Sequence, residues 1–431
     1  MPDREPRFDT RAVHAGQTPD PATGARATPL YQTTSYVFDD ADSAAELYAL
    51  DREGDIYSRI SNPTVRTLER RLASLEGGTD AVATASGMAA LDAATTLLAR
   101  AGDNVVSSSA IYGGTRSYLD HTASRRGVEA RFFDPLALDE LAAAADDRTA
   151  YVHVETVGNP SLVTPDLEAV ADVAHDAGAP LVVDNTFATP ALCRPLERGA
   201  DVVWESTTKW LHGAGTTIGG ALIDGGSFPW ADQPDRFPEL GGERPAFDGL
   251  VFAERFGDRA FAAAARHRAV RPTGGYQSPF DAWQTLQGVE TLPLRMAKHC
   301  ANAEAVAGFL DGDDRVDWVT YPGLAGHPTH DHASEYLDGG YGGMVAFGPA
   351  GGFEAAQAVC EGTELASFLA NVGDAKTLVI HPASTTHAQL SEAEQRESGV
   401  TPDLVRLSVG LEDPADVCAD LDRALDAVGG A

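Results

Sequence analysis

The stretch Ser206-Thr207-Thr208-Lys209-Trp210-Leu211-His212-Gly213 decides the fold, together with an acid that precedes its lysine by 25 positions. That acid, Asp184, closes the apolar run Pro180-Leu181-Val182-Val183, which is typical of a buried strand. Lys209 lies among hydroxyl side chains in a loop that ends in glycine, and it is one of only three lysines in the 431 residues. A lysine in a loop is usually a solvated side chain, but this chain uses arginine almost everywhere else. The setting therefore favours a functional amine.

This lysine and this acid are the pair that pyridoxal phosphate (PLP) chemistry requires. A lysine amine forms a Schiff base with the cofactor aldehyde, and a carboxylate keeps the pyridine nitrogen protonated so that the ring accepts electrons. We therefore predict that Lys209 and Asp184 are catalytic and bind PLP. No metal is expected, because the His-rich stretch 327–332 lies in a polar loop broken by proline.

Strand-like runs alternate with helical segments through the first half of the chain, which predicts an α/β fold with a mostly parallel sheet covered by helices. The predicted strands are 81–83, 104–106, 151–154, 180–183, 201–204 and 220–223, and helices are predicted over 88–100, 167–177 and 280–310. A long loop is expected over 228–257. The predicted parts are an N-terminal arm (1–60), a large domain (61–260) and a smaller C-terminal domain (261–431).

Four polar residues come just after strand-like runs: Ser86, Glu155, Asp184 and Ser206. Ligands of such sheets bind beyond the carboxyl ends of the strands, so these side chains are expected at one edge. Ser86-Gly87-Met88 opens an Ala-rich helix whose backbone N–H groups suit a phosphate, although a simple helix cap is the alternative.

Hydroxyls and an arginine extend the predicted phosphate site. Ser206 and Thr208 supply hydroxyls beside Lys209, and Arg59 can pair with a phosphate bidentately. The alternative for Arg59 is an ordinary surface loop.

Two further residues stand out by their surroundings. Tyr112 precedes two glycines and is able to stack on a flat ring or relay a proton, but a core tyrosine is equally compatible with the sequence. Arg406 lies within the apolar run 404–410 and needs an anionic partner, because an unpaired buried charge is costly. That partner is a substrate carboxylate or a structural acid.

Composition limits the environment and the partners. A formal charge of −32 disfavours nucleic acid, which requires a basic patch, and indicates an acidic shell suited to a salt-rich (halophilic) cytoplasm. The four cysteines form no CxxC motif, which suits a reducing compartment. We see no apolar run long enough for a membrane and no secretory signal, so a cytoplasmic location is expected.

Taken together, these segments resemble the Cys/Met-metabolism family of PLP enzymes, whose architecture is fold type I (aspartate-aminotransferase-like). The resemblance runs from Thr10–Gly16 to Arg406–Glu412. Within the family the chain is most similar to the O-acetylhomoserine sulfhydrylases, chiefly through Leu369–Lys376 and the segment from His381 to His387.

The resemblance implies roles for individual residues. Ser86, Gly87, Met88, Ser206 and Thr208 would bind the phosphate. Tyr112 would stack on the ring and assist proton transfer, and Asn159 would lie near the ring hydroxyl. Asn371 and Arg406 would hold the amino-acid carboxylate. Tyr57 and Arg59 would reach the phosphate of a neighbouring subunit, which implies dimers that share active sites and assemble into a homotetramer.

The resemblance also implies an activity, the γ-replacement of O-acetyl-L-homoserine by sulfide or methanethiol. Methionine γ-lyase and cystathionine γ-synthase or γ-lyase share the same lysine, acid and phosphate-binding residues, so these activities remain alternatives. A cofactor-binding protein without catalysis is a third possibility. A nucleotide-binding dehydrogenase is disfavoured, because no GxGxxG follows the first strand.

Overall fold

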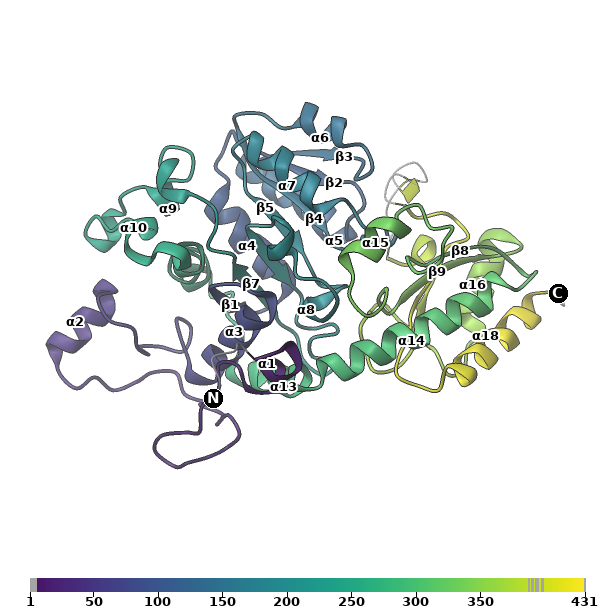
Figure 1. Ribbon diagram of the computed structural model, residues 1–431, viewed down its shortest axis with the longest axis horizontal. Coiled ribbons are helices and arrows are strands. Elements are labelled where there is room, and N and C mark those ends of the chain that lie inside the picture. The colour runs from purple at the N-terminus through teal and green to yellow at the C-terminus, as the bar shows by residue number, and fades with distance from the viewer. Residues whose placement is uncertain (1–5, 387, 389–390, 392–394, 397–398, 430–431) are drawn as a thin grey trace.

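The computed structural model describes residues 6–386, 388, 391, 395–396 and 399–429 (Figure 1). A large sheet with its helices forms one part of the molecule, and a smaller sheet forms the other. The helix α14 (Leu292–Asp311) runs from the first part along the second. The predicted fold class, an α/β protein with a large sheet and a smaller C-terminal one, is confirmed.

The large sheet has seven strands in the order β1-β7-β6-β5-β4-β2-β3. All neighbours pair in parallel except β7, which is antiparallel to both β1 and β6. The strands are β1 (Asp80–Thr84), β2 (Asn104–Ser108), β3 (Glu129–Phe133), β4 (Thr149–Glu155), β5 (Leu181–Asp184), β6 (Val202–Glu205) and β7 (Gly220–Asp224). The six predicted strands are confirmed. The strand β3 was not predicted, because it is an edge strand whose charged residues leave no clear apolar run.

The small sheet has five strands in the order β10-β11-β12-β9-β8, and only β10 and β11 pair in parallel. Its strands are β8 (Val316–Thr320), β9 (Met344–Pro349), β10 (Ser367–Phe368), β11 (Leu378–Ile380) and β12 (Val405–Ser408). Buried residues of α14, α16 and α18 form one apolar cluster with this sheet.

Helices cover the large sheet because their apolar residues recur at helical spacing. In α7 (Leu167–Asp176) the residues Leu167, Val170, Ala171 and Ala174 are buried, and the Asp166 side chain caps the start by accepting from Ala169 N at 3.0 Å. The remaining longer helices are α1 (Phe8–His14), α2 (Ala41–Ala49), α3 (Pro63–Glu76), α4 (Gly87–Leu98), α6 (Leu138–Ala144), α13 (Pro279–Glu290), α15 (His330–Tyr336), α16 (Gly352–Gly362) and α18 (Pro414–Gly429). Short helices include α5 (Gly113–Ser117), α8 (Thr189–Leu192), α9 (Pro238–Gly241), α10 (Phe252–Phe256), α11 (Ala260–Ala264) and α12 (Arg271–Thr273).

The helical stretch expected over 280–310 is confirmed, and it consists of two helices, α13 and α14, which meet at Thr291. Pro293 lies in the first turn of α14, where its missing N–H does no harm, whereas inside one continuous helix it would remove a hydrogen bond. The excursion 228–257 contains the short helices α9 and α10 rather than only a loop.

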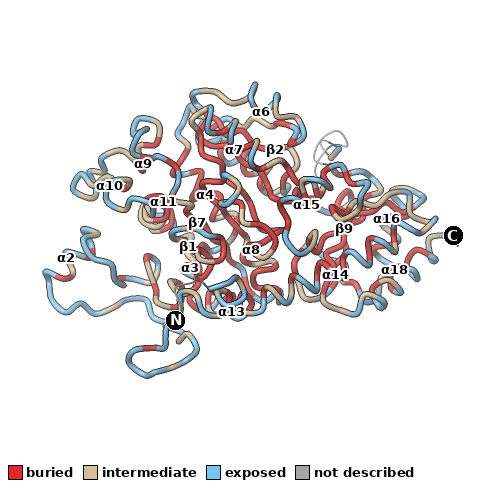
Figure 2. Tube along the Cα trace, in the orientation of Figure 1, coloured by how far each residue is buried: buried red, intermediate tan, exposed pale blue. Residues whose placement is uncertain are grey.

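The described part of the N-terminal arm (6–60) extends away from the part of the molecule that contains the large sheet (Figures 1 and 2). The segment is less extended than expected, because α1 packs on α3 and α2 forms a separate helix within it. The domain boundaries after residues 60 and 260 stay predictions, and residues 1–5 and 430–431 lie outside the described residues.

Buried residues concentrate in the strands of both sheets and in the helix faces against them (Figure 2). Within the described ranges, no helix combines the length and the apolar character needed to cross a membrane.

Candidate active site

A cavity of about 300 Å³ lies beyond the carboxyl ends of β4, β5 and β6 and extends to the small sheet. Eleven of the thirteen residues predicted for the site line it: Ser86, Gly87, Met88, Tyr112, Asn159, Asp184, Ser206, Thr208, Lys209, Asn371 and Arg406. They come together because parallel strands β4, β5 and β6 are neighbours in the sheet and end at one edge.

Lys209 lies one turn after β6, and its Nζ donates to Asn371 Oδ1 at 2.6 Å. Burial, and then the positive charge of Arg406, lower the pKa of Lys209 to about 8. A larger share of the amine is therefore neutral near pH 7 than for an exposed lysine, which suits a nucleophile or a base.

Asp184 ends β5 and is buried, with Thr186 N donating to its Oδ1 at 2.9 Å. Burial raises the pKa of Asp184 to about 7. A carboxylate in this setting gains strongly from a cationic partner, since the partner offsets the cost of its burial. A protonated pyridine nitrogen is a partner of this kind.

The start of α4 forms a cradle that fits a phosphate. Ser86 caps the helix by accepting from Ala89 N at 3.1 Å, and the first amides of a helix lack acceptors within it. A Cβ on Gly87 would lie 2.9 Å from Ser206 Cβ, so only glycine allows the two chain segments to approach this closely. The start of α4 and Ser206 thus line one cavity, and the residues present fit the phosphate group of PLP.

Glu155, which was expected at this sheet edge without a specific role, also lines the cavity and connects two of the predicted residues. Its carboxylate accepts from Tyr112 N at 2.6 Å and from Asn159 N at 3.1 Å. Burial, and then Asp184, raise the pKa of Glu155. Its place after a strand-like run was the available signal, but its two backbone partners lie 43 and 4 positions away, and only the fold brings the first to it.

Tyr112 is half exposed at the mouth of the cavity. A Cβ on Gly114 would lie 2.3 Å from the tyrosine ring, so this glycine leaves room for the ring. The core-tyrosine alternative is therefore wrong.

Arg406 is buried in β12, and its Nη1 donates to Asn159 Oδ1 at 3.0 Å. Burial lowers the pKa of Arg406 to about 10. Among the described residues no carboxylate pairs with it, so the structural-acid alternative finds no support. An anionic ligand in the cavity would supply the missing partner.

Tyr57 and Arg59 are the two predicted residues that the structure places elsewhere. They line a separate cavity on the arm, where Arg59 donates to Arg271 O and its guanidinium lies 5.5 Å from the centre of the Tyr57 ring. Within this chain they do not reach Lys209.

Several lining residues were not predicted from the sequence. They are uncharged and comprise Gly113, Val157, Thr186, Phe187, Trp204, Ile218, Ala370 and Val372. Apolar residues after strands resemble ordinary core residues in sequence, so no signal separates them from the core.

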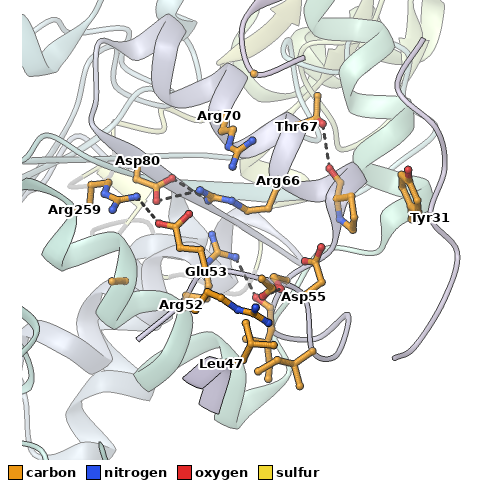
Figure 3. Close-up of a pocket in the computed structure, with 18 of the residues that line it drawn as sticks. Tyr31, Leu47, Arg52, Glu53, Asp55, Arg66, Thr67, Arg70, Asp80 and Arg259 are labelled. Carbon is orange, nitrogen blue, oxygen red and sulfur yellow. Dashed lines mark hydrogen bonds and ion pairs between the residues drawn. The ribbon is translucent and has the colours of Figure 1, made fainter. Parts of the chain in front are cut away.

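A larger cavity of about 440 Å³ lies between the arm and the body (Figure 3). Two ion pairs join charged side chains of its lining, Arg66 with Asp80 at 2.9 Å and Arg259 with Glu53 at 2.9 Å. It contains neither Lys209 nor Asp184, so it is not the centre of the PLP chemistry. Across the part of the chain that the structure describes, no cluster of three or more His, Cys, Asp or Glu is placed to hold a metal ion.

Comparison with known proteins agrees with this geometry. The profile of the family described as "Cys/Met metabolism PLP-dependent enzyme" matches residues 9–426. The chain is 49% identical to homocysteine synthase of Schizosaccharomyces pombe, over 99% of this chain and 100% of that one. It is also 49% identical to O-acetyl-L-homoserine sulfhydrylase 1 of Thermus thermophilus, over 97% of this chain and 100% of the relative.

Solved structures show the same fold. A putative O-acetylhomoserine (thiol)-lyase from Campylobacter jejuni superposes with a TM-score of 0.94 at 39% identity, covering 97% of this chain and all of that one, and it carries a pyridoxyl-lysine monophosphate. The metB protein of Corynebacterium glutamicum superposes with a TM-score of 0.83 at 35% identity, with 98% of each chain covered.

Proposed function

Because this chain belongs to the Cys/Met metabolism PLP-dependent enzyme family, we propose that it catalyses γ-replacement on O-acetyl-L-homoserine. In this reaction the bond between Cγ and the acetoxy oxygen breaks and a bond between Cγ and sulfur forms. Sulfide and O-acetylhomoserine thereby become homocysteine and acetate. Methanethiol in place of sulfide would give methionine.

The observation that carries the proposal is the meeting of Lys209, Asp184 and Arg406 in one cavity. An amine, a buried carboxylate, and a guanidinium without a carboxylate partner among the described residues are the groups that an amino-acid substrate and PLP require together. The whole-length similarity to homocysteine synthase and to an O-acetylhomoserine sulfhydrylase supports this substrate over other amino acids.

PLP, when bound, supplies an electron sink that stabilises negative charge at the substrate Cα. We propose that Lys209 holds the cofactor through its amine and that Asp184 pairs with the ring nitrogen. Ser86, Gly87, Met88, Ser206 and Thr208 would hold the phosphate, while Tyr112 covers the ring and Asn159 lies beside the ring hydroxyl.

The protein's own groups then direct the proton transfers. The amine of Lys209, with its lowered pKa, accepts the proton from the substrate Cα and returns a proton to the carbon chain. Arg406 and Asn371 hold the substrate carboxylate, which orients Cα toward Lys209. The apolar lining, which includes Val157 and Phe187, limits the water that would divert the reaction toward elimination.

A product assay tests the proposal. Purified protein with PLP and O-acetylhomoserine is assayed in high salt with and without sulfide, and homocysteine and 2-oxobutyrate are both measured. Sulfide-dependent homocysteine with little 2-oxobutyrate in its absence is the expected result. Free formation of 2-oxobutyrate without sulfide would indicate a γ-lyase, and cystathionine formed with cysteine as acceptor would indicate a γ-synthase.

We also propose that two subunits share their active sites in a dimer and that dimers assemble into a homotetramer. Tyr57 and Arg59 lie away from their own chain's cavity, and the arm exposes apolar side chains such as Val37 (99% exposed) and Tyr48 (50% exposed). If sites are shared, subunits carrying Lys209→Ala mixed with subunits carrying Arg59→Ala regain activity, because a hybrid contains one complete site. Mixtures that stay inactive would exclude sharing.

The net charge of −32 supports the proposal that the enzyme works in a salt-rich cytoplasm. Counter-ions there screen the repulsion among surface carboxylates.

A further inference from the structure

The residues that follow Lys209 form a tight turn in which two backbone carbonyls receive no hydrogen bond from the turn itself. His212 N donates to Thr207 O at 3.1 Å and Gly213 N donates to Lys209 O at 2.7 Å, and Gly213 ends the turn with a φ of +74°. These are the carbonyls of Trp210 and Leu211. They need donors from outside the turn, because the last carbonyls of a helical turn have no donor within it.

Arg295, on the first half of α14, supplies these donors. Its Nη1 donates to Trp210 O at 2.7 Å, and its Nη2 donates to Leu211 O at 3.2 Å and to Gly288 O at 2.8 Å. Burial lowers the pKa of Arg295 to about 10, and no carboxylate pairs with it within the described residues. Arg295 is a partly buried cation whose acceptors are all neutral, namely these three carbonyls and Thr291 Oγ1, which accepts from its Nε at 3.2 Å. Such a cation is costly, so its bonds to this turn require an explanation.

Glycines show how closely the turn is enclosed by other segments. A Cβ on Gly288 of α13 would lie 2.2 Å from His212 O, and a Cβ on Gly213 would lie 2.0 Å from Arg295 Nη1. On the opposite side, a Cβ on Gly373 would lie 2.7 Å from Trp210 N. The turn is thus held between the α13–α14 corner and the segment that carries Asn371, the acceptor of the Lys209 amine.

The same face of α14 makes a second contact with the turn. His299, four residues after Arg295, lies edge-on to the Trp210 ring with 6.5 Å between ring centres. Because α14 also packs on the small sheet, the turn and the substrate-carboxylate residues share one support.

We propose that Arg295 is a positioning residue, which fixes the turn after Lys209 to α14 and so sets where the Lys209 amine points. The inference rests on the proposed function for the role of Lys209 itself. Without Arg295, the two carbonyls lose their donors, the turn becomes looser, and the amine is no longer held toward Asn371 and the cofactor.

Arg295→Met and Arg295→Lys test the proposal, with matched changes at Arg236 as controls. Arg236 also donates to two backbone carbonyls, Ala177 O at 2.8 Å and Thr149 O at 2.5 Å, and burial also lowers its pKa, but it is not part of the cavity. Any general loss of stability therefore appears in both sets of variants.

The first readout is hydrogen–deuterium exchange of the protein freed of PLP. Arg295→Met is expected to speed exchange in peptides covering residues 207–213 by about tenfold or more, since each lost anchor allows local opening. Arg295→Lys keeps one donor and is expected to show a smaller increase. Arg236→Met is expected to leave these peptides unchanged.

The second readout uses the holoenzyme. Arg295→Met is expected to release PLP faster and to shift the pH titration of the cofactor's visible absorbance, with kcat lowered about 10- to 100-fold and a smaller change in KM. If Arg295→Met does not fold, Arg295→Lys serves instead, because it keeps the positive charge and only one donor.

Unchanged exchange over 207–213, or an equal effect from Arg236→Met, would overturn the proposal. The exchange measurement needs no substrate. If the natural enzyme makes no homocysteine while Arg295→Met still loosens the turn, the proposed function fails and the positioning role stands.

Discussion

Lys209 Nζ donates a 2.6 Å hydrogen bond to Asn371 Oδ1, although the two residues are 162 positions apart in the chain. Lys209 follows the strand β6 of the large sheet, and Asn371 lies between β10 and β11 of the small sheet. The bond therefore links the two sheets across the cavity, and it holds the amine beside Asn371, which is proposed to bind the substrate carboxylate.

Lys209→Ala is expected to abolish turnover, with a loss of at least about 1,000-fold, because the amine both holds the cofactor and moves protons. The visible absorbance of lysine-bound PLP should also disappear. Lys298→Ala is the control, since Lys298 is exposed on α14. Substantial sulfhydrylation by the Lys209→Ala protein would contradict the assignment.

Arg406→Ala is expected to raise KM for O-acetylhomoserine about 100-fold and to change PLP binding little. The guanidinium is buried, and among the described residues its hydrogen-bond partner is the neutral Asn159, so an anionic substrate gains strongly from it. Steady-state kinetics and PLP titration measure the two effects, with Arg423→Ala on α18 as control. An unchanged KM would mean that the carboxylate binds elsewhere.

A pair of buried carboxyl groups beneath the site makes stability depend on pH. Glu76 and Glu205 are fully buried and lie beside each other, and Asn185 Nδ2 donates to Glu76 Oε1 at 2.7 Å. Burial raises the pKa of both, that of Glu76 to about 7. Among neighbouring charges, Arg194 lowers the pKa of Glu76 and Glu197 raises it. Asp184 raises the pKa of Glu205 further.

A raised pKa in the folded state means that the stabilisation is complete below the unfolded pKa of about 4.5 and is lost as pH rises through about 7. The unfolding temperature of the PLP-free protein is therefore expected to fall as pH rises from about 4.5 to about 7, where Glu76 is ionised in the unfolded chain but still protonated in the folded protein. In Glu205→Gln the fall should be smaller, because the amide removes one charge and donates to Glu76. Scanning fluorimetry measures this, with Glu354→Gln as an exposed control. Equal slopes in all three proteins would exclude the pair as the cause.

Salt is expected to stabilise the enzyme through its acidic surface. Raising KCl from about 0.1 to about 1 M shortens the screening length from about 10 to about 3 Å, which weakens repulsion in a chain of net charge −32. The unfolding temperature should rise across this range. Sucrose at matched osmolality should have a smaller effect, and an equal effect would show that screening is not the cause.

The sequence by itself determined the strands and the polar residues that end them. Apolar runs such as 180–183 predict buried strands wherever they occur, because burial acts on the segment locally. Parallel strands with helices between them then place Asp184 and Ser206 at one edge, and Gly87 at the start of a helix next to it. Lys209 was recognisable because the chain contains few lysines and this one follows such a strand.

The tertiary structure alone decided which residues meet across the chain. The sequence does not reveal that β7 inserts antiparallel between β1 and β6, nor that Thr291 divides the helix expected over 280–310. The contacts of Lys209 with Asn371, Tyr112 with Glu155 and Arg295 with Trp210 join residues 162, 43 and 85 positions apart. Such pairs are selected by the packing of whole sheets and helices, which no local pattern of residues records.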